Sequence, residues 1–247
     1  VTILNYANRL YIVVTGVFSF VVTNLIFPKL SRANSANCTE ETNSLIVTSM
    51  KAVTMVILPI MAVFTILPEP IITVIYKHGK FDAVAETSLA LACYSVGMIG
   101  MSLNEVLSKS FFSMQNSKTP MVNAIISMVC NIILAYALSA KLAVGGLALA
   151  AAFGSIINAF LNYICMRKKR GKLFSAADRI DIVKIVVSAL VMAGVILCVY
   201  LPLKNWARTG IVQSLAAGAA AGLAGIAAYA AAMFISGESE IKGLLKK

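Results

Sequence analysis

Arg9 is the residue of this sequence whose type and position most clearly suggest chemistry. It directly precedes eighteen uncharged residues, Leu10 to Phe27, in the stretch LNYANRLYIVVTGVFSF at positions 4–20. A guanidinium deep in hydrocarbon costs about 3 kcal/mol on insertion scales, and its planar fork suits phosphate oxygens. Two interpretations follow. Either the side chain reaches lipid headgroups from a helix end, or the helix begins further upstream and Arg9 faces a wet cavity that holds a phosphate or pyrophosphate.

Four further residues suggest a gate or a cavity lining. Two prolines flank Glu69, and a basic turn with Gly79 follows, in LPEPIITVIYKHGKFDA (67–83). This motif is typical either of a gate at the outer face or of a kinked helix followed by an ordinary turn. Glu105 and Lys109 are four residues apart and can pair on one helix face, as a structural pair or at a cavity wall.

Four asparagines lie inside or at the edges of apolar segments: Asn104, Asn123, Asn131 and Asn158. Hydrogen bonding between neighbouring helices is the usual role of such amides in a membrane. Contact with a substrate is the alternative.

The sequence lacks the residue patterns of an enzyme or a metal site. It has no paired carboxylates, no histidine-based nucleophile system and no phosphate-binding glycine loop. The single histidine, His78, cannot form a metal site alone, and no pair of the five cysteines has zinc or redox spacing. We therefore expect no catalysis, no metal and no cofactor.

Composition places these side chains in a membrane. Hydrophobic residues make up 60% of the 247 residues and charged residues 13%, with a mean hydropathy of +0.88, whereas a soluble domain is about half apolar and a quarter charged. Runs without charge predict seven helices that cross the bilayer, the fourth and fifth joined by a tight hairpin at Lys141. They are Leu10–Phe27, Ala52–Pro68, Thr87–Asn104, Thr119–Ala140, Leu142–Met166, Ile185–Leu203 and Thr209–Gly237. The predicted fold is an all-α transmembrane bundle.

Basic residues predict the orientation of this bundle. One set of alternate connections (28–51, 105–118, 167–184 and 238–247) holds 15 Lys and Arg residues, and the other set holds 6. The richer side, with RKKRGK at 167–172, is predicted to be cytoplasmic, as is the C-terminus. Anionic lipid then accounts for the net charge of +11 without any nucleic acid.

Two regions are predicted along the chain. Residues 1–170 would form a region of five spans with a basic loop, which the family resemblance given next implies is a transport lobe. Residues 171–247 would add two terminal spans, preceded by a short helix over 172–184 that lies on the membrane surface.

Several blocks together resemble a known family. LNYANRLY and TGVFSFVVTNLIFPKLSR (within 4–32), LPEPIITVIYKHGKFDA (67–83), YSVGMIGMSLNEVLSKSFFSMQNSKTP (94–120) and GGLALA (145–150) occur in this order. They look like the C-terminal half of the MurJ (MviN) lipid II flippases, in the multidrug/oligosaccharidyl-lipid/polysaccharide exporter superfamily. The resemblance covers most of residues 4–170, whereas 180–247 agree in hydropathy and position.

The resemblance implies two lobes of six helices around a cavity, plus two C-terminal helices. This chain would supply the second lobe from its second helix onward and the terminal pair, in the bacterial inner membrane. Arg9 would hold the pyrophosphate of lipid II, with Asn5 and Asn8 of the same NYANRL block as further substrate contacts. The terminal helices would form an apolar groove for the prenyl tail. The implied partners are lipid II, membrane lipids and the N-terminal lobe of the same protein.

Two positions depart from the family pattern, and other functions stay open. Val14 stands where family members commonly have a proline, and Ile12 where they often have an acidic residue. One alternative is a flippase of another polyprenyl-linked glycan or a drug exporter, although this half offers intramembrane carboxylates only at span edges, Glu69 and Glu105. A non-transporting membrane scaffold is another alternative.

Overall fold

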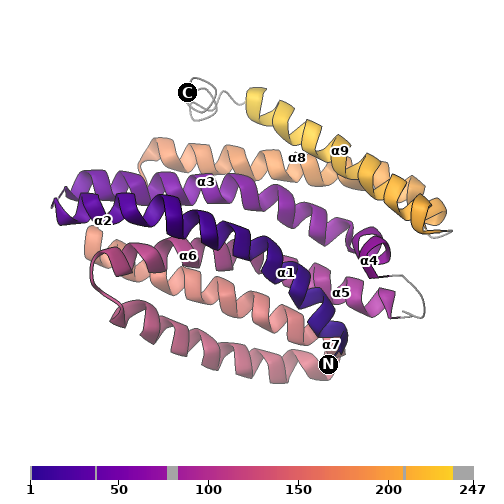
Figure 1. Ribbon diagram of the computed structural model, residues 1–247, viewed down its shortest axis with the longest axis horizontal. Helices are drawn as coiled ribbons and strands as arrows, with labels where there is room; N and C mark the ends of the chain where they lie inside the picture. The colour runs from indigo at the N-terminus through magenta and orange to yellow at the C-terminus, as the bar shows by residue number, and fades with distance from the viewer. Residues whose placement is uncertain (1, 37, 77–82, 208–209, 236–247) are drawn as a thin grey trace.

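Helices that run along one common long axis make up this protein, as a computed structural model shows (Figure 1). The structure describes residues 2–36, 38–76, 83–207 and 210–235. All regular structure in these residues is helical, which confirms the predicted all-α fold. The elements are α1 (Thr2–Val21), the π-helical turn η1 (Val22–Ile26), α2 (Phe27–Ser35), α3 (Thr39–Ile66), α4 (Pro68–Tyr76), α5 (Val84–Ser95), α6 (Met98–Ser113), α7 (Lys118–Arg170), α8 (Ala176–Ala207) and α9 (Ile211–Ile235).

Prolines account for two irregularities. Pro28 lies in the first turn of α2, directly after η1, and a proline removes one amide donor from the helical hydrogen-bond ladder. The chain therefore stays helical from Thr2 to Ser35 but changes its winding at η1. The second irregularity lies at Pro68 and Pro70. There α3 ends at Ile66 and α4 begins at Pro68, a first-turn position that a proline tolerates well.

The long element α7 is a helical hairpin. Its two arms are Lys118–Ala140 and Val144–Arg170, and Figure 1 shows them lying side by side. A Cβ atom added at Gly146 would meet the backbone carbonyl of Leu138, so a side chain there would prevent the close return of the chain. The predicted tight hairpin is confirmed.

The described residues contain one fewer membrane-length helix than the sequence predicts. Within the described residues, six segments are long and apolar enough to cross a bilayer: α3, α5 with α6, the two arms of α7, α8 and α9. The predicted span Leu10–Phe27 is not among them. Its helix begins at Thr2, so α1 includes the polar residues Asn5, Asn8 and Arg9, and these dilute the apolar character of its first half.

The alternate connections gather at opposite ends of the bundle (Figure 1). One end holds the end of α2, the end of α6, both ends of the α7 hairpin that carry Lys118 and Arg170, and the start of α8. The bend of α7, α4 and the junction of α8 with α9 lie at the other end. The predicted separation of basic-rich and basic-poor connections is thus confirmed for the connections that the structure describes. The connection 238–247 lies outside the described residues, and the assignment of one end to the cytoplasm stays a prediction.

The prediction of a separate short helix over 172–184 is wrong, whereas its position on the membrane surface stays a prediction. Residues 176–184 are the first turns of α8, which continues without a break to Ala207. Lys51 of α3 explains the difference, because its buried ammonium lies 3.1 Å from a carboxylate oxygen of Asp178 and 3.1 Å from one of Asp181. These ion pairs pack the start of α8 against α3.

Candidate functional site

A polar pocket lies midway along the bundle, among α1, α5, α6 and both arms of α7. Its volume is about 490 Å³. The polar residues that line it are Asn8, Tyr11, Tyr94, Ser127, Asn131, Ser155 and Asn158, together with Met101 and other apolar residues. None of the described residues that line it is charged. Such a surface offers neutral hydrogen-bond donors and acceptors beside apolar side chains.

Tyr11 forms the aromatic wall of this pocket. Its buried side chain donates a hydrogen bond from Oη to the Sδ atom of Met101 at 3.0 Å. Its ring lies 5.7 Å from that of Tyr94, measured between centroids, within the range of favourable aromatic pairs. Packing from two helices therefore fixes the orientation of Tyr11.

A network of amides supports one side of the pocket. Asn162 is fully buried, and its Oδ1 accepts a hydrogen bond of 2.8 Å from Nδ2 of Asn123. Its own Nδ2 donates to Oδ1 of Asn104 at 2.7 Å and to Oδ1 of Asn158 at 3.3 Å. The network joins α6 to both arms of α7 and holds Asn158 at the pocket wall. Interhelical hydrogen bonding is therefore confirmed for Asn104 and Asn123, whereas Asn158 bonds Asn162 within its own arm of α7.

Asn131 has a different environment. It lines the pocket opposite Gly154, where an added Cβ would lie 3.0 Å from the Cβ of Asn131. Gly154 thus leaves the space into which the Asn131 amide projects. Asn131 thus packs against the second arm of α7 and also lines the pocket, so both of its predicted roles stay predictions.

Asn8 is the predicted site residue that lines the pocket. Asn5 and Arg9 are exposed on the same helix, and neither lines the pocket. Arg9 nevertheless lies beside it along α1, because Asn8 precedes it by one residue and Ile12, three residues later, also lines the pocket. In the part of the chain that the structure describes, no carboxylate pairs with Arg9, consistent with the isoleucine at position 12.

The other predicted cavity or gate residues are not brought together. Glu105 and Lys109 pair within α6 at 3.7 Å, as the four-residue spacing predicts, and neither lines the polar pocket. Glu69 lies in the first turn of α4, near one end of the bundle, and is also outside the pocket. Gly79 lies outside the described residues.

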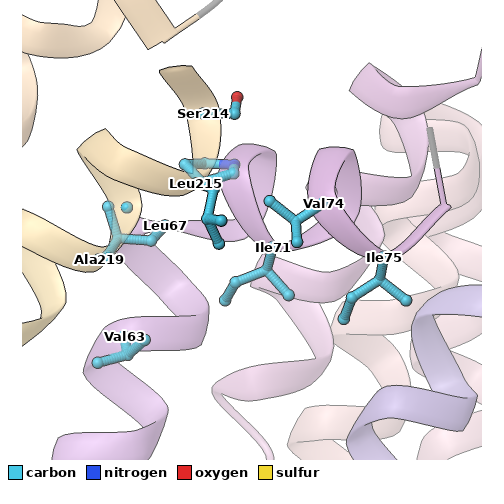
Figure 2. Close-up of a pocket in the computed structure, with 10 residues that line it drawn as sticks. Val63, Leu67, Ile71, Val74, Ile75, Ser214, Leu215 and Ala219 are labelled. Atoms are coloured by element: carbon cyan, nitrogen blue, oxygen red, sulfur yellow. The ribbon is translucent and has the colours of Figure 1, made fainter. Parts of the chain in front are cut away.

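A second, apolar pocket of about 250 Å³ opens between α9 and the junction of α3 with α4. Figure 2 shows Leu215 and Ala219 of α9 on one side and Leu67 and Ile71 on the other. An added Cβ at Gly218 would lie 2.9 Å from the Cβ of Pro70, so this glycine permits the close approach of α9 to α4. We call this pocket the α4–α9 groove.

The helices that form the groove differ from those expected from the sequence. The two terminal helices were expected to form it between them, but α8 contributes no residue to the α4–α9 groove. The helices α8 and α9 pack directly on each other, and an added Cβ at Gly225 would meet the side chain of Ile196. This tight contact leaves the open surface of α9 facing α4.

Sequence reasoning missed several polar residues of the site: Tyr11, Tyr94, Ser127, Ser155 and Asn162. Helical spacing was the available signal. Asn158 and Asn162 are four residues apart, as are Ser127 and Asn131, so each pair shares one helix face within an apolar segment. Polar residues on one face of a membrane helix generally face the interior of the bundle.

Comparisons with known proteins agree on one family. The family model described as "Lipid II flippase MurJ" matches residues 1–219. A probable lipid II flippase MurJ of Vibrio cholerae is 27% identical over 237 residues, covering 95% of this chain and 45% of the relative. One of Rhizobium tropici is 30% identical over 198 residues, covering 78% and 37%.

A solved structure titled "Lipid II flippase MurJ, inward closed conformation" is also similar. It superposes with a TM-score of 0.74 at 26% identity, covering 95% of this chain and 46% of the solved chain. This chain therefore spans less than half the length of the relatives it matches.

Proposed function

Since this chain belongs to the lipid II flippase MurJ family, we propose that it is the C-terminal part of a protein that moves lipid II from the inner to the outer leaflet of the bacterial inner membrane. The match of the family model over residues 1–219 carries this proposal. The family is one of transporters, and the chain is a multi-pass membrane protein. Its role would be in peptidoglycan synthesis, without catalysis of its own.

Arg9 is the residue proposed to hold the diphosphate of lipid II. Its helix begins seven residues earlier, at Thr2, and Arg9 is exposed within one turn of two residues that line a pocket midway along the bundle. These positions support the cavity interpretation over the one in which Arg9 reaches the headgroups. An arginine fork can donate two parallel hydrogen bonds to phosphate oxygens, replacing water that the diphosphate loses in the protein.

The polar pocket is proposed to bind uncharged parts of the headgroup. Sugars and peptides carry hydroxyl and amide groups, which match the amides of Asn8, Asn131 and Asn158 and the hydroxyl of Ser155. The pocket lacks charged residues among those described, so it complements Arg9 rather than repeating its function. Asn5, exposed one turn before Arg9, is a further proposed contact.

The remaining part of the protein is proposed to supply the opposite lobe. This chain covers 46% of the solved flippase it resembles, and α1 exposes Asn5, Arg9, Val13 and Phe20. We expect the two lobes to enclose the cavity between them and to rock about it in alternating access. Enclosure is required because unpaired polar groups in hydrocarbon cost several kcal/mol each.

The α4–α9 groove is proposed to take part of the prenyl tail. Its lining is almost wholly apolar, and the small residues Gly218 and Ala219 open its α9 side. A prenyl chain needs no hydrogen bonds, so it can stay against such a surface while the headgroup crosses.

A substitution of Arg9 tests this function. In the complete protein, Arg9→Ala should abolish growth of cells depleted of their own lipid II flippase, and Arg9→Lys should restore it only partly, because a point charge replaces a fork. The matched control is Lys118→Ala, which removes an exposed charge at the first residue of α7, and it should complement fully. Membrane abundance of each variant is measured by immunoblot.

The same assay separates the alternatives. A scaffold or an exporter of another substrate would not restore growth even as the unaltered protein. Full complementation by Arg9→Ala at normal abundance would show that Arg9 does not hold the substrate, and would return it to the headgroup-reaching interpretation.

A further inference from the structure

The basic run at the end of α7 is divided between distinct pockets. Arg167, together with Lys172 in the link to α8 and Arg179 in α8, lines a pocket of about 390 Å³. Lys169 and Arg170 line another pocket, where Arg170 also donates a hydrogen bond to Asn34. The fold thus assigns basic residues that are neighbours in the sequence to different pockets.

The first of these pockets, which we call the α7–α8 basic pocket, combines charge with an aromatic wall. Tyr163 and Phe174 lie in its lining with ring centroids 5.9 Å apart, and Leu173 is buried beneath it. Its three cations come from three consecutive segments of the chain. They converge only because the link between α7 and α8 folds back.

Neighbouring acids do not fully offset the positive charge of this pocket. The nearest acidic residues in sequence, Asp178 and Asp181, both lie 3.1 Å from the Lys51 ammonium, which offsets one of their two negative charges. Asp178 also accepts a hydrogen bond from the backbone N–H of Ser175 at 2.9 Å. Within the described chain, no ion pair involves the three cations of the pocket. An anion of about the size of a phosphate is the ligand that such a pocket favours.

The face of α8 that follows Arg179 in the sequence indicates that this anion carries a hydrocarbon chain. Val183, Val186 and Leu190 follow Arg179 at helical spacing, and their side chains are 60%, 40% and 66% exposed. Eleven residues of helix rise about 16 Å, which is about half of the roughly 30 Å hydrocarbon thickness of a bilayer. The stripe is therefore as long as one leaflet and begins at the basic pocket.

We propose that the α7–α8 basic pocket binds the phosphate of an anionic membrane phospholipid, whose acyl chain lies along the exposed stripe of α8. Arg167, Lys172 and Arg179 contact the phosphate, and the stripe accepts one chain of the same leaflet. This site is separate from the polar pocket beside Arg9 and does not depend on which lipid is transported.

Lipid binding to the full chain tests the proposal. Purified protein is titrated in neutral detergent with phosphatidylglycerol or phosphatidylcholine, and retained lipid is counted by native mass spectrometry. We expect the double variant Arg167→Gln/Arg179→Gln to bind phosphatidylglycerol roughly tenfold more weakly, since hydrogen bonds to charged groups are the stronger class. Lys168→Gln/Lys169→Gln removes the same charge outside this pocket and should change the affinity less than twofold.

Three further arms complete the experiment. Lys172→Gln, which lies outside any helix, should also weaken binding and covers the case in which the double variant does not fold. Inorganic phosphate should not displace phosphatidylglycerol at equal concentration, and phosphatidylcholine should bind weakly. Equal losses in both double variants would show a diffuse charge effect and overturn the proposal. Displacement by inorganic phosphate would do the same, because the ligand would then be a soluble anion.

Discussion

Asn162 connects more of the protein than any other single amide described here. All of its hydrogen-bond partners, Asn104, Asn123 and Asn158, are themselves amides, and they come from α6 and from both arms of α7. No water is available in hydrocarbon to satisfy a polar group that loses its partner. Asn162 therefore fixes the packing of the hairpin and, through Asn158, the wall of the polar pocket.

Replacing this central amide should loosen the hairpin. Asn162→Leu removes three hydrogen bonds and leaves partner amides without them, so we expect the free energy of unfolding to fall by about 1–2 kcal/mol, the upper range for such bonds between membrane helices. Chemical denaturation in micelles measures the change. Asn24→Leu is the control, because exposed Asn24 bonds only the carbonyl of Phe20 in its own helix. Equal losses in the two variants would contradict the role of the network.

Small residues set how closely the elements approach. An added Cβ at Gly97 would lie 2.7 Å from the Cα of Ala152, and one at Gly100 would lie 2.6 Å from the backbone nitrogen of Ile156. Thus α6 touches the second arm of α7 backbone to backbone, and this contact positions Met101 and Ser155 on the same pocket. Neither backbone can move aside as a flexible side chain would.

A methyl group at this contact should separate the helices. Gly100→Ala is expected to destabilise the protein by about 1–3 kcal/mol, as overpacking typically does. Gly194→Ala, at a glycine of α8 with no atom within 4 Å of the added Cβ, should be neutral or stabilising, since alanine is the better helix former. Thermal unfolding of both variants in the same detergent gives the comparison. A Gly100→Ala protein as stable as its Gly194→Ala counterpart would disprove the contact.

The α4–α9 groove allows a similar matched pair on one helix. Gly218→Ala places its Cβ 2.9 Å from Pro70, whereas Gly222→Ala meets nothing within 4 Å. Both changes gain the same helix propensity, about 1 kcal/mol, so their difference reports the groove alone. If the groove takes the prenyl tail, Gly218→Ala should slow growth in the complementation assay and Gly222→Ala should not. Wild-type growth with Gly218→Ala would argue against that use of the groove.

At the scale of the molecule, the basic connections among the described residues lie at one end of the bundle. The ends of α2, α6 and α7 and the start of α8 bring the basic connections together, while the bend of α7 lies at the opposite end (Figure 1). Positively charged connections are retained on the cytoplasmic side during insertion. We therefore expect the basic end, with the α7–α8 basic pocket, to face the cytoplasm.

Thiol labelling checks this orientation. Cys38 is exposed between α2 and α3 at the basic end, and exposed Asn205 lies near the end of α8, at the other end. In a variant that retains only Cys38, a membrane-impermeant maleimide should react after the cells are permeabilised but not in intact spheroplasts. Asn205→Cys, with the native cysteines replaced, should react in both. The reverse pattern would invert the topology.

Local features of the sequence were enough to predict the membrane environment, the helical class, the hairpin at Lys141 and the family. These features depend on local properties, namely the lengths of uncharged runs, the positions of prolines and short ordered motifs, and all of them are visible without knowing which helices touch. The pairing of Glu105 with Lys109 was predictable for the same reason, because both residues lie on one helix.

Which residues share a site became visible only from the packing of the helices. It brought Asn8 together with Asn131, Asn158 and two tyrosines, and left Glu69 and Glu105 apart, because packing between distant segments sets these distances. Packing also made residues 176–184 part of α8, through ion pairs to Lys51, which is 130 residues before Asp181 in the sequence. The apolar groove opens toward α4 because Gly225 lets α8 and α9 pack tightly against each other. Each of these outcomes depends on close contact between residues that are far apart in the chain, which hydropathy and spacing do not encode.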